Sequence, residues 1–213
     1  MRDYSRIDEY LDDLKNDIYS QPSDPGHTAW ATNAIERFIL PIKEEISFVL
    51  DVGCGDGFCR SIFEDHGMNW TCITLGEEEV GESIIQNDMS FIDCPNDYYE
   101  LVFARHVLEH SPMPLLTLME WKRVSNKYAL IILPAPEYWE YGGRNHYSML
   151  EKKQWEFLFE RAGWNIIKEH ELKTTDSIFL DYWMEGVIKR EDRVWKGEME
   201  VVEYQFLLEK KYE

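Results

Sequence analysis

Basic residues are few in this sequence: 22 Lys and Arg stand against 41 Asp and Glu, which gives a formal net charge of −19 at pH 7. Proteins that follow a nucleic-acid backbone draw much of their affinity from clustered Lys and Arg. The charge therefore argues against a nucleic-acid partner. A small molecule that is neutral or cationic fits this composition better.

Long apolar runs are also absent. No stretch approaches the roughly 18–20 apolar residues that a helix needs to cross a bilayer, and residues 1–8 contain no apolar signal-peptide core. We therefore expect a cytoplasmic protein without a membrane partner.

Cysteine is scarce as well, and none of the four forms a Cys-x-x-Cys pair or lies at zinc-finger distance from His. The four are Cys54, Cys59, Cys72 and Cys94, all within or beside expected core elements. This pattern predicts reduced thiols with a structural role rather than metal ligands.

The length suits one α/β domain over residues 1–213. Apolar residues at helical spacing over residues 5–19, and a second helical stretch to about residue 40, predict an N-terminal helical cap over residues 1–44. We expect residues 45–213 to form the α/β core.

Beyond the cap, apolar runs that favour strands alternate with stretches that favour helices. The alternation is typical of a three-layer α/β/α Rossmann-like sandwich, here with a mostly parallel seven-stranded sheet and an antiparallel last strand that is exposed on one side. Such sheets bind ligands at the carboxyl ends of the strands, where the strand order reverses. We expect strands at 48–52, 70–75, 86–90, 100–104, 128–133, 164–172 and 200–208, and helices at 58–66, 77–85, 112–124 and 150–162.

The most informative stretch is residues 48–57, where an apolar strand runs into Asp51 and then into Gly53, Gly55 and Gly57. Glycines at alternating positions let the backbone turn sharply and approach a ligand with no Cβ in the way. A turn of this kind after a buried strand is typical of a nucleoside-binding loop, although the spacing alone is weakly specific.

Two further motifs follow that loop in order. The three stretches are Val-Leu-Asp-Val-Gly-Cys-Gly-Asp-Gly at 49–57, Asn-Asp-Met at 87–89 and Phe-Ala-Arg-His-Val-Leu-Glu-His-Ser-Pro at 103–112. Together they resemble the class I S-adenosylmethionine-dependent methyltransferases, in particular a small group whose fourth strand runs into His-x-Leu-Glu-His. The resemblance covers most of residues 45–172, and it implies S-adenosylmethionine as cofactor and S-adenosylhomocysteine as product.

The resemblance also implies roles for individual residues. The acid at Asp51 and the loop backbone would surround the methionine portion of the cofactor, and Asp88 would take the adenine amino group. The family's ribose-binding acid closes the second strand, where this chain has Gly76, so Glu77, displaced by one position, takes that role. The implied cofactor-binding residues are Asp51, Gly53, Cys54, Gly55, Gly76, Glu77, Asp88, Met89, Ala104, Arg105 and His110. From the residues alone, Asp51 could instead cap the next helix, and Asp88 could be an ordinary turn residue.

Residues 106–110 also spell His-x-x-Glu-His, a zinc-binding pattern of metallopeptidases. Zinc would need His106 and His110 on one face of a sustained helix and a third ligand, whereas this stretch follows a strand directly and is stopped by Pro112. We therefore expect no metal, and we expect both histidines to line the pocket or to pack against the loop.

Methyl transfer needs positioning above all, and it needs a base only when the acceptor must lose a proton. The segment 134–149 is rich in aromatic residues and is expected to hold the acceptor. His146 within it is the best general-base candidate, because the ordinary pKa of His lies near operating pH. His106 is the second catalytic candidate, and docking of the loop is the alternative role for His146.

The sequence thus predicts a methyltransferase that acts on a small, partly apolar or cationic acceptor by in-line transfer. Two alternatives stay open. The spacing of Glu77 from the glycine loop, about 20 residues, also suits a nicotinamide-dependent oxidoreductase. The same fold could also belong to a non-catalytic nucleoside-binding protein.

Overall fold

A computed structural model describes residues 5–15, 25–75, 83–136, 145–178 and 200–212. The segments between these ranges include Gly76 and Glu77 and half of the expected acceptor loop, residues 137–144, so the predictions for those residues lie outside the described residues. The elements are α1 (Ser5–Lys15), α2 (Pro25–Phe38), η1 (Leu40–Glu45), β1 (Phe48–Val52), α3 (Arg60–Glu64), β2 (Asn69–Thr74), β3 (Ile84–Gln86), β4 (Tyr99–Arg105), η2 (Leu108–His110), α4 (Pro114–Val124), β5 (Ser125–Pro134), α5 (Lys152–Ala162), β6 (Trp164–Lys173) and β7 (Val201–Lys210).

The seven strands form one sheet in the order β3-β2-β1-β4-β5-β7-β6. Strands β1 to β5 pair in parallel, and β7 is antiparallel to both of its neighbours. The predicted mixed sheet with an antiparallel last strand is therefore confirmed. The order reverses between β1 and β4, where Val52 pairs with Ala104, so the carboxyl ends of these strands lie side by side at the expected ligand position.

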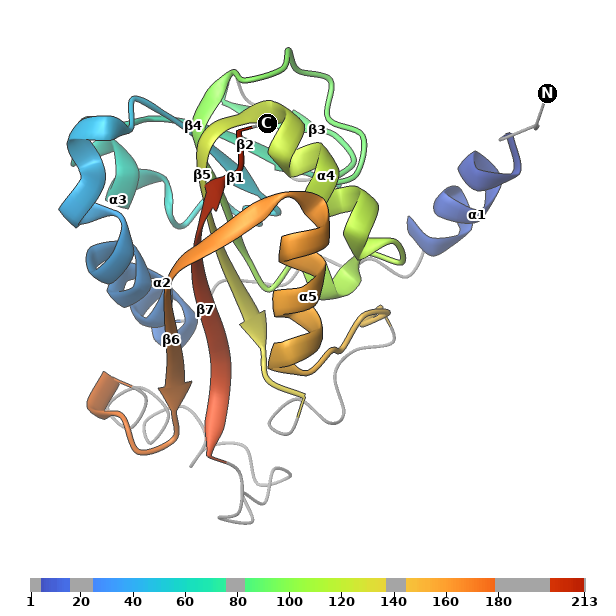
Figure 1. The fold of residues 1–213 in the computed structure, drawn as a ribbon. Helices are drawn as coiled ribbons and strands as arrows, with labels where there is room; N and C mark the ends of the chain where they lie inside the picture. Colours follow the sequence, from blue (N-terminus) through green and yellow to red (C-terminus); the bar gives the residue numbers. More distant parts are fainter. Residues whose placement is uncertain (1–4, 16–24, 76–82, 137–144, 179–199, 213) are drawn as a thin grey trace.

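Helices cover both faces of the sheet, with α2 and α3 on one side and α4 and α5 on the other (Figure 1). One core cluster joins α2 and α3 to the sheet through Ile35, Phe38 and Phe63. The other joins α4 and α5 through residues such as Trp121 and Trp155. The three-layer prediction is confirmed, while α1 lies apart from these layers in Figure 1. The division into cap and core stays a prediction.

Local sequence signals explain the ends of α5. The Glu151 carboxylate accepts from the backbone of Gln154, and the Gln154 side chain accepts in return from the backbone N–H of Glu151, at 2.9 Å. This capping box satisfies amide groups at the start of the helix. Gly163 ends the helix with a φ of 88°, a left-handed conformation that suits glycine.

The expected bounds of the third strand and of the helix before it are wrong. The third strand lies at 84–86 rather than 86–90, because Asp88 and Phe91 close a turn in which the Ser90 amide donates to Asp88 Oδ1 at 2.7 Å. The helix expected over 77–85 does not extend through Ile84 and Ile85, because these residues pair with β2 as part of β3.

The last strand was expected to be exposed on one side, yet residues 202–208 of β7 are all buried. Strand β7 lies between β5 and β6 instead of at the sheet edge, and helices cover both faces there. Among the described residues, no helix has the length and apolar character needed to span a membrane.

Candidate functional site

The glycine loop leaves the carboxyl end of β1 with three residues in the left-handed region, Gly53 at φ 70°, Gly55 at φ 55° and Gly57 at φ 78°. A Cβ on Gly53 would overlap the Val107 side chain, so this loop lies directly against the segment that follows β4. At Gly55, no described atom would lie within 4 Å of a Cβ. Glycine is thus required at Gly53 by close packing, and at Gly55 it borders open space that a ligand could occupy.

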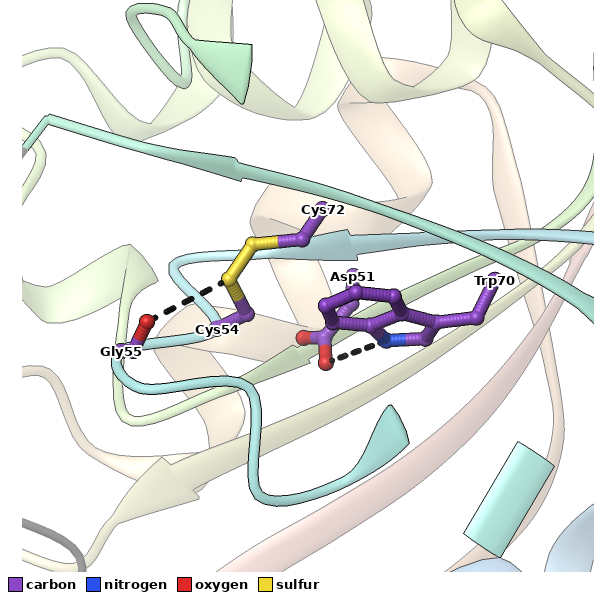
Figure 2. The surroundings of a disulfide bond; sticks show 5 residues. All are labelled: Asp51, Cys54, Gly55, Trp70 and Cys72. Carbon is purple, nitrogen blue, oxygen red and sulfur yellow. Dashed lines mark hydrogen bonds between the residues drawn. A yellow bond between two sulfur atoms is a disulfide. The ribbon is translucent and has the colours of Figure 1, made fainter. Parts of the chain in front are cut away.

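Asp51 is the next-to-last residue of β1, and its carboxylate is buried against the next strand. Its Oδ2 accepts a hydrogen bond from the indole Nε1–H of Trp70 at 3.0 Å (Figure 2). Burial raises the pKa of Asp51 to about 7, and the Trp70 hydrogen bond offsets part of that rise. The alternative of a helix-capping Asp51 is wrong, because the residue that precedes α3 is Cys59 and Asp51 instead binds Trp70.

The glycine loop is also tied covalently to β2. Cys54 and Cys72 form a disulfide across a Cα–Cα distance of 5.9 Å (Figure 2), within the usual range for such bonds. The expectation of four reduced thiols is therefore wrong for this pair, although Cys59 and Cys94 are free thiols. Sequence spacing could not show the pair, because it depends on the parallel register that sets Asp51 opposite Cys72. The Cys54 Sγ also lies 3.6 Å from the Gly55 carbonyl oxygen.

Arg105 and His106, at the carboxyl end of β4, turn their side chains toward Glu203 on β7. The Arg105 guanidinium forms an ion pair with the Glu203 carboxylate, and His106 Nε2 lies 2.9 Å from the same oxygen. Burial, followed by the nearby Arg105 charge, lowers the pKa of His106 to about 4. Sequence reasoning missed Glu203, which stands 98 residues after Arg105. The side chain predicted as a second catalytic group is thus held in a buried ion network.

His110 faces the described end of the expected acceptor loop. Its Nδ1 lies 3.0 Å from the Asn145 carbonyl oxygen, and its ring meets the His146 ring edge-on with centroids 4.7 Å apart. The Ser148 amide donates to the Glu109 carbonyl oxygen at 2.9 Å, which docks this loop on η2. Donor atoms of Glu109, His110 and His146 all lie within 4.8 Å of one another. The side chains of His106 and His110 therefore have different partners: His106 contacts Glu203, and His110 packs against His146.

The remaining predicted cofactor residues are placed as follows. Ala104 is buried in β4 opposite Val52 of β1. Asp88 forms a turn with Ser90, as its alternative role predicted, and the Met89 carbonyl oxygen accepts from Trp121 Nε1 at 3.0 Å. Asp51, Gly53, Cys54, Gly55, Ala104 and Arg105 come together at the β1 and β4 ends, and Val107 connects them to the His110 segment.

Comparison with known proteins gives one family. A family model described as a methyltransferase domain matches residues 28–169. No curated protein gives a significant match to the chain. The matched range covers both the glycine loop and the segment from β4 to His146.

Solved structures share the fold at low sequence identity. A S-adenosylmethionine-dependent methyltransferase from Archaeoglobus fulgidus aligns with a TM-score of 0.64 at 16% identity, covering 98% of this chain and 100% of that one. One from Mesorhizobium loti aligns with a TM-score of 0.58 at 13% identity, covering 78% and 91%. The cyclase SpnF aligns with a TM-score of 0.67 at 15% identity, covering 99% and 94%. The fold alone therefore does not decide the reaction.

Proposed function

The chain belongs to the methyltransferase-domain family and uses S-adenosylmethionine as its cofactor, and on this premise we propose that it transfers the methyl group in line to a small-molecule acceptor. An acceptor atom attacks the methyl carbon while the carbon–sulfur bond breaks and its electron pair returns to sulfur, which gives S-adenosylhomocysteine. The family match favours this reaction over the nicotinamide-dependent alternative.

The observation that best supports the binding site is the open space beside Gly55. The loop reaches the carboxyl end of β1 next to β4, where the strand order reverses, and its left-handed glycines let the backbone approach a ligand. We propose that Gly53, Cys54 and Gly55 offer backbone groups to the methionine portion of the cofactor. Asp51, whose carboxylate is fixed by the hydrogen bond from Trp70, would stabilise the conformation of this loop.

The other proposed contacts surround the same edge of the sheet. Ala104 and Arg105 would line the pocket with backbone, because the Arg105 guanidinium is already paired with Glu203. Asp88 and Met89 would meet the adenine, Glu77 beside Gly76 would bind the ribose, and His110 would close the pocket.

We propose that the acceptor enters beside His146. Burial lowers the pKa of His146 below its ordinary value, so its imidazole is neutral near pH 7 and can accept a proton from the acceptor. His106 is the weaker candidate because it is buried beside Glu203. The net charge of −19 supports a neutral or cationic small molecule over a nucleic acid. A cytoplasmic location remains a prediction from composition.

The test is titration calorimetry with S-adenosylhomocysteine on wild type and Gly55→Val. We expect wild type to bind and the variant to lose binding, because a branched side chain would fill the space that the ligand must enter. Gly67→Val is the matched control. Gly67 also has a positive φ, of 82°, and open space around it within the described structure, but it lies in the turn before β2, at the opposite edge of the sheet.

Both substitutions carry the same kind of backbone strain, so any shared loss of stability is visible in the control. Circular dichroism would check that each variant is folded. Wild-type affinity in a folded Gly55→Val protein would contradict the site assignment. Equal loss in both variants would show that strain, and not occupation of the pocket, governs binding.

A further inference from the structure

The cluster of Glu109, His110 and His146 has the donor atoms of a metal site. One ligand atom from each side chain lies within 4.8 Å of the other two. Zinc binds carboxylate oxygen and imidazole nitrogen at about 2.0–2.2 Å, which places two ligand atoms at most about 4.4 Å apart. To coordinate one ion, each of these three ligand atoms would therefore have to move by less than about 1 Å.

Glu109 supplies an independent reason to expect a cation. The residue is fully buried, neither carboxylate oxygen has a hydrogen-bond partner on any other residue that the structure describes, and the interaction with its own backbone amide offsets only part of the cost of burial. Buried polar groups are normally satisfied, and an unpaired buried carboxylate is costly. Burial accordingly raises the pKa of Glu109 to about 8. A bound cation would take the place of the missing partners.

The imidazoles of His110 and His146 each have a ring nitrogen that is available to bind a metal. His110 Nδ1 lies 3.0 Å from the Asn145 carbonyl oxygen, so Nδ1 donates its N–H there and Nε2 presents its lone pair toward Glu109, 3.9 Å from Oε1. Metal-binding histidines commonly have their other ring nitrogen fixed in this way by a backbone carbonyl. The Nδ1 atom of His146 is buried and has no partner within the described structure.

We propose that Glu109, His110 and His146 bind one divalent first-row transition metal, with zinc as the reference ion. Two histidines with one carboxylate, and a further position left open, form a ligand set typical of catalytic zinc. Magnesium and calcium prefer oxygen ligands and fit this set less well. The expectation of no metal failed to anticipate the cluster because it paired His106 with His110, whereas His106 is engaged by Glu203.

The site lies close to the proposed cofactor pocket. Val107, which packs against Gly53, is two residues before Glu109. If the proposed function holds, the open metal position would hold an oxygen or nitrogen of the acceptor. His146 would then act as a metal ligand and not as the general base. Metal binding itself does not depend on that role.

The test is titration of the chelator-treated full chain with Zn²⁺, with Mg²⁺ as comparison, followed by Co²⁺ absorption spectroscopy. We expect one tight Zn²⁺ per chain and a Co²⁺ d–d spectrum of low coordination number. Glu109→Gln and His146→Gln should each weaken Zn²⁺ binding at least about 100-fold, since each removes one of three protein ligands. His66→Gln is the control, because His66 is exposed in the turn between α3 and β2 and is not part of the cluster.

Absence of stoichiometric Zn²⁺ binding, tighter binding of Mg²⁺ than Zn²⁺, or equal Zn²⁺ affinity in all three variants would each overturn the proposal. Thermal melts would show whether every variant is folded. Titration of the same samples with S-adenosylhomocysteine separates the two proposals. Cofactor binding without zinc binding would remove only the metal site, and zinc binding without cofactor binding would remove only the proposed function.

Discussion

Glu203 and Glu109 are both fully buried near the carboxyl end of β4, yet their surroundings are opposite. The Glu203 carboxylate is met by the Arg105 guanidinium and by His106, and Gln205 Nε2 donates to it at 3.4 Å. Glu109 has no such partner among the described residues. The Glu203 carboxylate is therefore paired within the fold, whereas the Glu109 carboxylate is available to bind a proton or a cation.

The difference shows how partners decide the state of a buried acid. Transferring a carboxylate out of water costs free energy, and this cost is offset only where well-placed cations or hydrogen-bond donors contact the carboxylate. Asp51 lies between the two cases, because its one described donor is the neutral Trp70 indole and its pKa is raised to about 7. Glu109, without a donor side chain, reaches about 8. A buried acid without partners is thus the better indicator of a ligand site.

The largest effect is expected from Glu203→Gln. Removing one member of a buried ion pair leaves the Arg105 guanidinium without its counter-charge, and such losses amount to about 3–5 kcal/mol. Urea unfolding at pH 7 would measure the change in unfolding free energy. A loss below about 1 kcal/mol would mean that Glu203 is no more engaged than Glu109.

A smaller effect is expected from Asp51→Asn, as a function of pH. Because the pKa of Asp51 is raised in the folded state, that state keeps a proton which the unfolded chain has released between about pH 4 and pH 7. The carboxyl therefore makes the protein less stable as pH rises through this window, by at most about 1.4 kcal/mol per pH unit. His106 and His110, with pKa lowered to about 4, act in the opposite direction in both proteins.

The quantity to follow is the unfolding free energy of wild type minus that of Asp51→Asn, measured without ligand at pH 5 and pH 6. The histidine contributions cancel in that difference. It should fall between the two pH values, and a constant difference would show that Asp51 has an ordinary pKa.

The smallest effect is expected from Glu109→Gln in metal-free protein at pH 7. With a pKa of about 8 the carboxyl is mostly neutral there, and a neutral amide of similar shape replaces it. The change in unfolding free energy should stay within about 1 kcal/mol. A loss as large as that of Glu203→Gln would show that Glu109 has structural partners, and would weaken the case for a metal.

The sequence was most informative where function depends on local pattern. The apolar run of β1, the alternating glycines and the apolar stretch 128–133 of β5, which is buried throughout, could be predicted because each signal lies within about ten residues. The three-layer arrangement followed from the alternation of strands and helices. The glycine positions were predictable because Gly53 and Gly55 need left-handed backbone.

What sequence could not show depends on contacts between distant segments. The Cys54–Cys72 disulfide depends on strand register, and the pairing of His106 with Glu203 depends on β7 lying beside β5. The joining of His110 to His146 depends on how the loop after β5 docks on η2. The pattern His-x-x-Glu-His contains Glu109 and His110 of the cluster, but it could not show that His106 contacts Glu203 whereas His110 contacts His146.

The most direct test of the methyltransferase assignment is titration calorimetry of the wild-type chain with S-adenosylhomocysteine, with NAD and NADP under the same conditions. We predict micromolar binding of S-adenosylhomocysteine alone. Binding of the dinucleotides alone, or of none of the three, would contradict the assignment of the glycine loop to S-adenosylmethionine.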